Sequence, residues 1–471
     1  MLVDKQKGEG AFARAPNLTG ARVTVVGLGI EGIDLTRFLA AEGARVTVSD
    51  IRTREDLSEA ISAIEDTGAT LSLGANREQD MTGADCVFVS QGVPPDLPAL
   101  RAARRASVPI SSMTRLFLER CPVPVAGITG SSGKTTTTAL VGEMLAEAGE
   151  DHVVGGNIGV GLLALLEEIG PGTRVVLELS HTQLESIEQS PQLACVTNVT
   201  PNHLDQYSWS SYVALKRRIF EHQRGDDLAI FFIDDEVAAA FAEEAPARVR
   251  YTSLLRPLPG DGVTLSGGLI VRREGGRETT VMHRDEIPLR GDHNAANVVC
   301  ALAMASVLGL ADESCAEAVR SFEGVPHRLE PVATVRGVQY VNDSIATTPE
   351  RTLAGMRTYE QPLVLLLGGR DKHLPLGELA REAVERCRAV VAFGEAGPTF
   401  ARAVADARDG ERPIVEQAGS IEDAVAAAAR LAREGDVVLC APAGTSFDAY
   451  RNFEQRGAAF RNAVAALGER G

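Results

Sequence analysis

A segment rich in glycine and hydroxyl residues, GITGSSGKTTTT at 127–138, has the residue types that bind a nucleoside triphosphate. Backbone N–H groups of such a turn, and of the helix that follows it, bind phosphate oxygens. Lys134 would neutralise the β- and γ-phosphates, and the hydroxyl of Thr135 would bind Mg²⁺. The usual pattern has a glycine where this sequence has Ile128. An ordinary turn with a chance Gly-Lys-Thr is the alternative, but the strand pattern before the motif and the helical pattern after it favour phosphate binding.

A second glycine-rich turn, GLGIEG at 27–32, matches the pattern G-x-G-x-x-G between a predicted strand and a predicted helix. Asp50 ends the next predicted strand, where dinucleotide-binding folds place a ribose contact. In isolation the pattern suggests a nicotinamide cofactor, but it also suits another nucleotide or simple packing of helix on strand. We favour a nucleotide other than NAD.

Two ionisable side chains could complete a metal site. Glu178 ends a predicted strand, and a carboxylate there can reach Mg²⁺, which prefers oxygen ligands. His203, in TNVTPNHLDQY at 197–207, could bind a second metal ion. Isolated acids and histidines are also common as solvated or structural residues. Lys216 lies in a predicted amphipathic helix at 211–222, and its spacing alone indicates an ordinary solvated lysine.

Polar residues also gather in two predicted loops, GDHNAAN at 291–297 and VNDSIATTPE at 341–350. Such residues can be simple turn formers, but both runs adjoin apolar segments and could line a cleft between domains. Lys372 and Ser446 each follow a predicted strand, at the edge where α/β proteins bind ligands.

Short β-branched runs alternate with longer helical patterns, which predicts parallel α/β sheets that position these motifs. Proline-containing segments near residues 121 and 324 indicate linkers, and a Gly- and Pro-rich stretch at 252–290 predicts a small β insertion. We therefore expect three α/β domains, at 1–121, 122–325 and 326–471. The main predicted strands are 22–26, 45–49, 85–90, 123–129, 174–179, 194–198, 228–233, 363–367, 389–393 and 436–440.

The charge and cysteine content restrict the class of protein. The chain has 471 residues and a formal net charge of −17, so its surface repels phosphate backbones and anionic lipid, and we expect no nucleic-acid or membrane partner. The longest apolar stretch, 298–311, is too short to span a bilayer and predicts a core helix. Seven scattered cysteines without zinc-binding spacing indicate reduced thiols. Without a signal peptide or an obvious apolar interface stripe, we expect a cytoplasmic monomer.

Taken together, the motifs resemble those of the Mur ligases, in the family's order and over nearly the whole chain, from about residue 20 to 468. Each motif alone is moderately specific, and their joint specificity is high. The segments that carry the resemblance are GLGIEG, GITGSSGKTT, GGNIG, LELSHTQLE, NVTPNHLDQY, ALKRRIFE, GDHNAAN, GVPHRLE, NDSIATT, LLLGGRDK and SFDAYRNFEQRG.

The resemblance implies a three-domain ATP-dependent amide ligase that adds glutamate, most plausibly D-glutamate, to UDP-N-acetylmuramoyl-L-alanine in peptidoglycan synthesis. The first, Rossmann-like domain would bind the UDP-sugar, so that GLGIEG would hold a diphosphate and not NAD. The central P-loop domain would bind ATP, and the third, Rossmann-like domain would bind the amino acid. ATP would convert the carboxylate to an acyl phosphate, which the glutamate amine attacks, with two Mg²⁺ ions neutralising phosphate charge.

The resemblance also assigns roles to individual positions. Thr135, Glu178, His203 and Lys216 would hold Mg²⁺, with Lys216 carbamylated, and Lys134 would join Glu178, His203 and Lys216 in catalysis. ATP would contact Gly130, Ser131, Ser132, Gly133, Lys134, Thr135, Thr136, Asn294, Asn297, Arg328 and Asp343. The UDP-sugar would contact Gly29, Ile30, Glu31, Gly32, Asp50, Arg52, Asn157, Ser180 and Gln183. The amino acid would contact His327, Thr347, Lys372, Ser446 and Phe453.

The sequence departs from the family's motifs at several places. The usual NDSKATN is NDSIATT here, so that Ile345 replaces a lysine expected near glutamate and ATP. Losing this cation could change how an anionic amino acid is held, including which enantiomer fits. Ser132 stands where asparagine is usual, His181 and Thr182 where Ser-Phe or Ser-Tyr is usual, and Gln91 interrupts the usual Ser-Pro-Gly.

Other readings of the sequence remain open. A related ligase, of the folylpolyglutamate type or another Mur enzyme, would use a different acceptor. An ATP-driven switch would need only the P-loop, but leaves Lys216, His203 and the C-terminal motifs unexplained. A nicotinamide dehydrogenase would use the first turn and show no glutamate-dependent ATP turnover.

Overall fold

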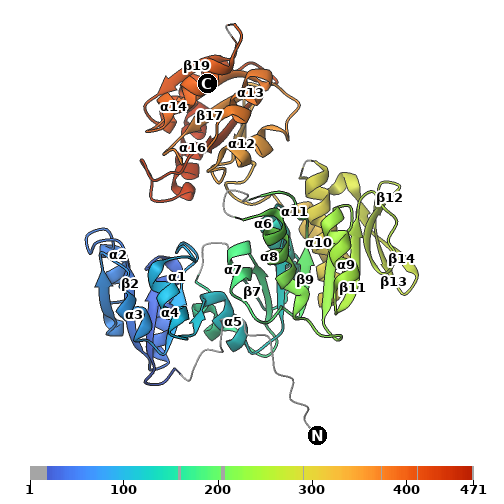
Figure 1. Ribbon diagram of the computed structural model, residues 1–471. Coiled ribbons are helices and arrows are strands. Elements are labelled where there is room, and N and C mark those ends of the chain that lie inside the picture. Colours follow the sequence, from blue (N-terminus) through green and yellow to red (C-terminus); the bar gives the residue numbers. More distant parts are fainter. Residues whose placement is uncertain are drawn as a thin grey trace. The chain divides into compact units, whose positions relative to one another are not determined.

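The computed structural model describes residues 18–156, 161–202, 207–289, 291–372, 374–410 and 412–468. They form two compact units. The first comprises the chain up to 288 together with 292–322, and the second comprises 289–291 together with the chain from 323 onward. In Figure 1 the first unit runs from blue to yellow, and the second is orange to red.

The first sheet has five parallel strands in the order β3-β2-β1-β4-β5. Its predicted strands are confirmed, and GLGIEG comprises the turn after the first strand and the first three residues of the first helix. The strands are β1 (Arg22–Val26), β2 (Arg45–Asp50), β3 (Thr70–Leu73), β4 (Cys86–Val89) and β5 (Ile110–Ser111). The helices are α1 (Ile30–Ala41), α2 (Ser58–Ser62), α3 (Glu78–Thr82), α4 (Pro98–Arg105) and α5 (Met113–Arg120).

The central sheet has nine strands in the order β14-β13-β12-β11-β10-β9-β6-β8-β7. The strands are β6 (Val125–Thr129), β7 (His152–Gly156), β8 (Arg174–Glu178), β9 (Leu193–Val196), β10 (Leu228–Phe232), β11 (Arg248–Ser253), β12 (Gly262–Ser266), β13 (Leu269–Glu274) and β14 (Arg277–His283). The helices are α6 (Lys134–Glu147), α7 (His181–Glu185), α8 (Trp209–Glu221), α9 (Glu236–Glu244), α10 (Asp292–Leu308) and α11 (Asp312–Ser321).

The β insertion predicted at 252–290 is confirmed, and it extends the central sheet. Strand β12 pairs parallel with β11, and β13 and β14 then continue the same sheet as an antiparallel hairpin. The carboxyl ends of β6, β8 and β9 therefore remain at one edge of the parallel part, where an α/β protein binds its ligand.

The third sheet, in the second unit, has the order β15-β16-β20-β17-β18-β19, with only β15 antiparallel to its neighbour. The strands are β15 (Glu330–Val335), β16 (Val338–Asn342), β17 (Leu363–Gly368), β18 (Cys387–Phe393), β19 (Ile414–Ala418) and β20 (Val437–Ala443). The helices are α12 (Pro349–Met356), α13 (Gly377–Arg386), α14 (Gly397–Ala407), α15 (Ile421–Leu431) and α16 (Phe453–Gly468).

The three sheets and their helices give the three α/β domains expected from the sequence, although the exact limits at 121–122 and 325–326 stay predictions. Strands β17 and β20 are buried along their whole length, as expected for parallel strands covered on both faces. The apolar stretch at 298–311 lies mainly in α10 and is largely buried, which confirms a core helix. Among the described helices, none has the length and apolarity needed to cross a membrane. All seven cysteines are free thiols, as predicted.

The FEQRG segment at the start of α16 has a structural role in the third domain. The fully buried Arg456 donates to the carbonyl oxygens of Ser344 and Gly444 at 2.9 and 3.1 Å, and so joins the loops that follow β16 and β20. A Cβ atom on the next residue, Gly457, would lie 2.0 Å from Nδ1 of His327. The close approach of α16 to the loops at the sheet edge therefore requires glycine at this position.

We expect Gly457→Ala to destabilise the third domain by about 1–3 kcal/mol, because the added methyl group must displace His327 or the helix. This should lower the melting temperature by several degrees, as measured by differential scanning calorimetry. Gly468→Ala is the matched control, because the same substitution at the end of α16 meets no atom within 4 Å. Equal melting temperatures for both variants would show that α16 can move without cost.

Candidate active site

The turn after β6 is held by the loop that follows β9. The backbone N–H of Ser132 donates to Oδ1 of Asn198 at 2.9 Å, and the hydroxyl of Thr197 donates to the Ser132 carbonyl at 2.7 Å. A Cβ atom at Gly130 would lie 2.0 Å from the Thr197 hydroxyl, and Gly133 has a φ of +80°. Gly130 is therefore required by the close approach of the two loops, and Gly133 by its left-handed backbone conformation directly before α6.

Two lysine ammonium groups meet at this turn. Nζ of Lys134 donates to the carbonyl oxygen of Gly130 at 3.0 Å, and Nζ of Lys216 donates to the same oxygen at 2.9 Å. Lys216 also donates to the hydroxyl of Thr129 at 3.0 Å and is 1% exposed. Burial, and then the charge of Lys134, lower the pKa of Lys216 well below its usual value, while Glu178 opposes the shift. The solvated lysine indicated by helical spacing alone is wrong.

The carboxylate predicted to reach Mg²⁺ lies beside this lysine pair. Glu178 is 2% exposed at the end of β8, which pairs parallel with β6 as predicted. A Cβ atom at Gly156, on the neighbouring strand, would lie 2.1 Å from the Glu178 carbonyl, so the backbone here is closely packed. Thr135 lies in the first turn of α6, after the phosphate-type turn.

This set of donors fits Mg²⁺ bound together with a nucleotide. Among the described residues, no three His, Cys, Asp or Glu side chains cluster as a protein-only metal site would require. Mg²⁺ usually takes one or two carboxylates and completes its shell with water and phosphate oxygens. The Glu178 carboxylate is a ligand of this kind, and the Thr135 hydroxyl lies in the first turn of α6, directly after the glycine-containing turn. His203, predicted to bind the second ion, lies outside the described residues.

The two asparagines predicted to contact ATP lie at the start of α10. Nδ2 of Asn297 donates to Oδ1 of Asn294 at 3.2 Å, and Oδ1 of Asn297 lies 3.5 Å from the hydroxyl of Thr137 on α6. A Cβ atom at Gly133 would come within 2.1 Å of Asn297 Oδ1. The structure thus brings these asparagines beside the predicted phosphate residues of the first unit, which are Gly130, Ser131, Ser132, Gly133, Lys134, Thr135 and Thr136.

The glycines of the first-domain turn differ in what they do. A Cβ atom at Gly32 would lie 2.0 Å from the Gly27 carbonyl, whereas one at Gly29 meets nothing within 4 Å. Gly32 is therefore needed for packing, and Gly29 and the 60% exposed Ile30 face open space that a ligand could occupy. Asp50 accepts from the Leu28 amide and from Arg52, and these bonds lower its pKa although burial alone would raise it.

Two of the departures from the family's motifs contact each other. Oε1 of Gln91 accepts from the hydroxyls of Ser180 and Thr182 at 3.2 and 2.9 Å. The Gln91 backbone N–H and side-chain amide both donate to the carboxylate of Glu31, at 2.8 and 2.5 Å. Burial raises the pKa of that carboxyl. Gln91 therefore connects the predicted sugar-nucleotide turn to the start of α7 in the central domain.

Ser180 and Gln183 form a capping box at the start of α7, where each side chain bonds to the other's backbone N–H. This fixes the Gln183 side chain, which is 1% exposed. Its Nε2 atom is buried and has no hydrogen-bond partner among the described residues. A buried unpaired amide donor at the start of α7 fits a substrate oxygen as its partner. Asn157, predicted to act nearby, lies outside the described residues.

The second unit gathers the residues predicted to contact the amino acid. Nζ of Lys372 donates to the Thr347 hydroxyl at 3.4 Å, and the His327 and Phe453 rings meet edge to face with centroids 6.1 Å apart. Ser446 is 2% exposed in the loop after β20. These residues follow β16, β17 and β20 or precede β15, and so they share one edge of the third sheet.

A buried carboxyl lies in the same domain. Asp343 is 4% exposed and follows β16, and its Oδ1 accepts from the Leu329 N–H at 3.2 Å. Burial raises its pKa to about 7, against the opposing effects of that bond and of the charges of Arg328 and Arg351. Arg328, predicted with Asp343 to contact ATP, is thus near it. Nothing in the spacing distinguished Arg351, which lies one residue beyond the polar run at 341–350.

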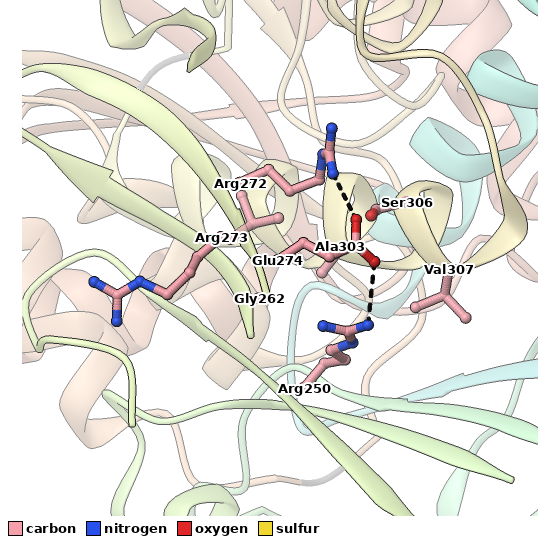
Figure 2. Close-up of a pocket in the computed structure, with 9 residues that line it drawn as sticks. Arg250, Gly262, Arg272, Arg273, Glu274, Ala303, Ser306 and Val307 are labelled. Carbon is pink, nitrogen blue, oxygen red and sulfur yellow. Dashed lines mark hydrogen bonds and ion pairs between the residues drawn. The ribbon is translucent and has the colours of Figure 1, made fainter. Parts of the chain in front are cut away.

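A small cavity elsewhere in the central domain contains none of the predicted site residues. Figure 2 shows the Glu274 carboxylate between Arg250 and Arg272, which pair with it at 3.3 and 2.8 Å, while the Arg273 side chain points away. The cavity encloses about 10 Å³, room for one water molecule at most. These arginines are neutralised by acids and belong to the structure of the sheet extension.

Three family models match the chain in order. The Mur ligase MurD-like N-terminal domain matches residues 21–112, the Mur ligase middle domain matches 128–305, and the Mur ligase glutamate ligase domain matches 327–444. Together they span the three sheets of the structure.

Curated proteins match over their full length. The UDP-N-acetylmuramoylalanine–D-glutamate ligase of Symbiobacterium thermophilum is 41% identical over 95% of this chain and 98% of its own. The protein of the same name from Roseiflexus sp. is 39% identical over 96% of this chain and 99% of its own.

Solved structures share the fold. A pseudomurein peptide ligase type C from Methanothermus fervidus has a TM-score of 0.56 and 18% identity, over 95% of this chain and 100% of its own. The UDP-N-acetylmuramate-alanine ligase MurC of Thermotoga maritima has a TM-score of 0.56 and 19% identity, over 95% and 99%.

We expect Asp343→Asn to stabilise the protein more at pH 8 than at pH 5. The folded-state pKa of about 7 exceeds the unfolded value of about 3.9, so folding favours the protonated acid. Stability therefore falls as pH rises from about 4 to 7, and the full cost is present above pH 7. Asparagine carries no charge and removes this cost.

The measurement is the melting temperature of both proteins at pH 5 and pH 8. The melting temperature of Asp343→Asn should exceed that of the wild type mainly at pH 8. Asp406→Asn, at an exposed position on α14, is the control and should show no such difference. An equal gain for Asp343→Asn at both pH values would contradict a buried acid with a raised pKa.

Proposed function

This chain belongs to the Mur ligase family, and we propose that it adds D-glutamate to UDP-N-acetylmuramoyl-L-alanine with hydrolysis of ATP, in peptidoglycan precursor synthesis. The curated relatives that carry this activity in their names match the chain from end to end, at 36–41% identity among the first four. The observation that carries the proposal within the structure is the meeting of Lys134 and Lys216 at one carbonyl beside Glu178. An ATP-driven switch would need Lys134 to bind phosphate, but it would not need Lys216.

In this proposal each of the three domains binds one substrate. The domain at 1–121 would bind the UDP-sugar at the open side of the Gly29 turn, and the domain at 122–325 would bind ATP at the turn after β6. The domain at 326–471 would bind glutamate at the edge that carries Thr347 and Lys372.

The chemistry needs an activated carboxylate, because a carboxylate is a poor electrophile. Transfer of the γ-phosphoryl group of ATP to the alanine carboxylate gives an acyl phosphate. The glutamate amine attacks its carbonyl carbon, and inorganic phosphate leaves as the amide forms. Lys134 would hold the transferring phosphoryl group, and the buried, unpaired Gln183 amide would orient the carboxylate. Mg²⁺ held by Thr135 and Glu178 would neutralise phosphate charge during the transfer.

We also propose that Lys216 is carbamylated. Its lowered pKa favours the neutral amine. The nitrogen lone pair of that amine can attack CO₂, and the nitrogen then loses one proton to give an N-carboxylate. The change converts an amine whose protonated form Lys134 repels into an anion that Lys134 attracts. With His203, the new carboxylate would hold the second Mg²⁺ ion.

The alternative functions are less favoured. A ligase with another acceptor is not favoured by the relatives, which share one name over the whole length. An ATP switch leaves the buried Lys216 without a purpose. A nicotinamide dehydrogenase finds support only in the GLGIEG turn.

The first test is release of phosphate from ATP and Mg²⁺ with UDP-N-acetylmuramoyl-L-alanine, in the presence of D-glutamate, L-glutamate or neither. We expect release that requires the sugar nucleotide and D-glutamate together, measured by a coupled phosphate assay. Release with L-glutamate alone would reverse the stereochemical assignment. Release independent of both substrates, or no release, would contradict the proposed ligase.

The second test concerns Lys216. Lys216→Ala should lose most activity, and short carboxylic acids such as formate or acetate should restore part of it by replacing the carbamate carboxylate. Lys134→Ala should also be inactive, but the same acids should not restore it, because that side chain acts as a cation. Arg217→Ala, on the same helix and paired with Glu244 at the surface, is the matched control and should remain active. A fully active Lys216→Ala enzyme would exclude the carbamate.

A further inference from the structure

The third domain lacks a cation where the family's motif places a lysine, and an arginine lies close to that place. Ile345 occupies the lysine position in NDSIATT. The guanidinium of Arg351 donates to the carbonyl oxygen of Ile345 at 3.3 Å. Arg351 is exposed and lies in the first turn of α12, with its side chain directed back along the loop that precedes the helix.

A second cation lies on the other side of this loop. Lys372 is exposed in the segment after β17, and its Nζ donates to the hydroxyl of Thr347 at 3.4 Å. Partial burial, and then the positive charge of Arg351, lower the pKa of Lys372. The two cations are therefore close enough to repel one another, with residues 345–347 between them.

No described carboxylate is paired with either cation. The described ion pairs of the second unit involve other arginines, and neither Arg351 nor Lys372 takes part in one. The charge of Arg351 acts on the nearby Asp343 and lowers the pKa of its carboxyl, but burial has the larger effect and raises that pKa to about 7. The carboxyl is therefore only partly ionised at neutral pH. It therefore neutralises the pair incompletely.

The position of Arg351 is itself unfavourable for the free protein. The first turn of a helix carries partial positive charge and favours acidic side chains, so an arginine there adds to the repulsion. Unpaired like charges kept together at the ligand-binding edge of a sheet indicate a site for an anion.

The loop that carries this site is held firmly. The buried Arg456 donates to the Ser344 carbonyl at 2.9 Å, and the Ile345 N–H donates to the His327 carbonyl at 3.2 Å. The Thr348 hydroxyl caps α12 by accepting from the Arg351 N–H. The guanidinium therefore projects from a fixed backbone, which limits the entropy lost when it binds an anion.

We propose that Arg351 binds a carboxylate of the incoming glutamate and takes the place of the lysine that Ile345 replaces. Glutamate carries two carboxylates, and Arg351 and Lys372 offer two cations at one edge of the third sheet. A planar guanidinium can bind a carboxylate through two parallel hydrogen bonds, which a lysine cannot. This inference rests on the proposed function, since it assigns a residue to the substrate of that reaction.

The test is a set of four enzymes assayed by phosphate release: wild type, Arg351→Ala, Arg351→Lys and the double variant Ile345→Lys/Arg351→Ala. We expect Arg351→Ala to raise the KM for glutamate by roughly ten- to a hundredfold, with the KM for ATP unchanged. Arg351→Lys should lie between this variant and the wild type. The double variant, which returns a cation to position 345, should recover most of the loss.

Arg402→Ala is the matched control, because it removes an exposed arginine from α14 in the same domain and should leave every kinetic constant unchanged. Melting temperatures identify a variant that fails to fold. If Arg351→Ala is unfolded, Arg351→Lys decides, because it keeps a cation at this position and should still raise the KM for glutamate without changing the KM for ATP.

Three outcomes would overturn the assignment: an unchanged KM for glutamate in Arg351→Ala, a rise confined to the KM for ATP, or a double variant as impaired as the single one. The second would place Arg351 on a phosphate. Each of them presupposes glutamate-dependent turnover by the wild type, whereas failure of the proposed function would appear as its absence. The two failures are therefore distinguishable.

Discussion

One backbone carbonyl, that of Gly130, accepts hydrogen bonds from both Lys134 and Lys216, and the central domain is built around this meeting. Two ammonium groups repel each other, and one of them is fully buried. The loop that follows β9 packs so closely on Gly130 that a side chain there would collide with Thr197. Burial, and then the charge of Lys134, lower the pKa of Lys216 and favour its neutral amine, which is the form that the proposed carbamylation requires.

The departures from the family's motifs are connected by contacts that the sequence does not display. Gln91 and Thr182 are far apart in the chain, yet they are hydrogen bonded, and Glu31 holds Gln91 from the other side. Ile345 loses a cation, and Arg351 places one at the Ile345 carbonyl. In both cases a residue that departs from the family's motif contacts a second residue: Gln91 contacts Thr182, which also departs from the motif, and Ile345 contacts Arg351. The chemistry required of the site can thus be kept while its residues are exchanged.

The sequence was sufficient for features that depend on local pattern. Apolar runs predicted the strands that carry the site, and glycine spacing predicted the turns at 27–32 and 127–138. It was insufficient where a side chain's environment is made by distant residues. Lys216 has the helical spacing of a solvated lysine, and only the packing of α8 against the end of β6 reveals its burial. The buried Arg456 likewise contacts two loops that precede it in the chain, at Gly444, 12 residues before it, and at Ser344, 112 residues before it.

The GLGIEG turn shows why a motif can be recognised without its ligand being known. Gly32 satisfies a packing requirement, because any side chain there would collide with the Gly27 carbonyl. Every domain that packs a helix this closely on its first strand has the same need, whatever it binds. Gly29 faces open space, and its lack of a side chain matters only for a ligand that approaches the backbone. Since the pattern records both requirements as glycine, it indicates a nucleotide-type turn, and the identity of the nucleotide must come from contacts that reach beyond its glycines, such as the contact of Glu31 with Gln91.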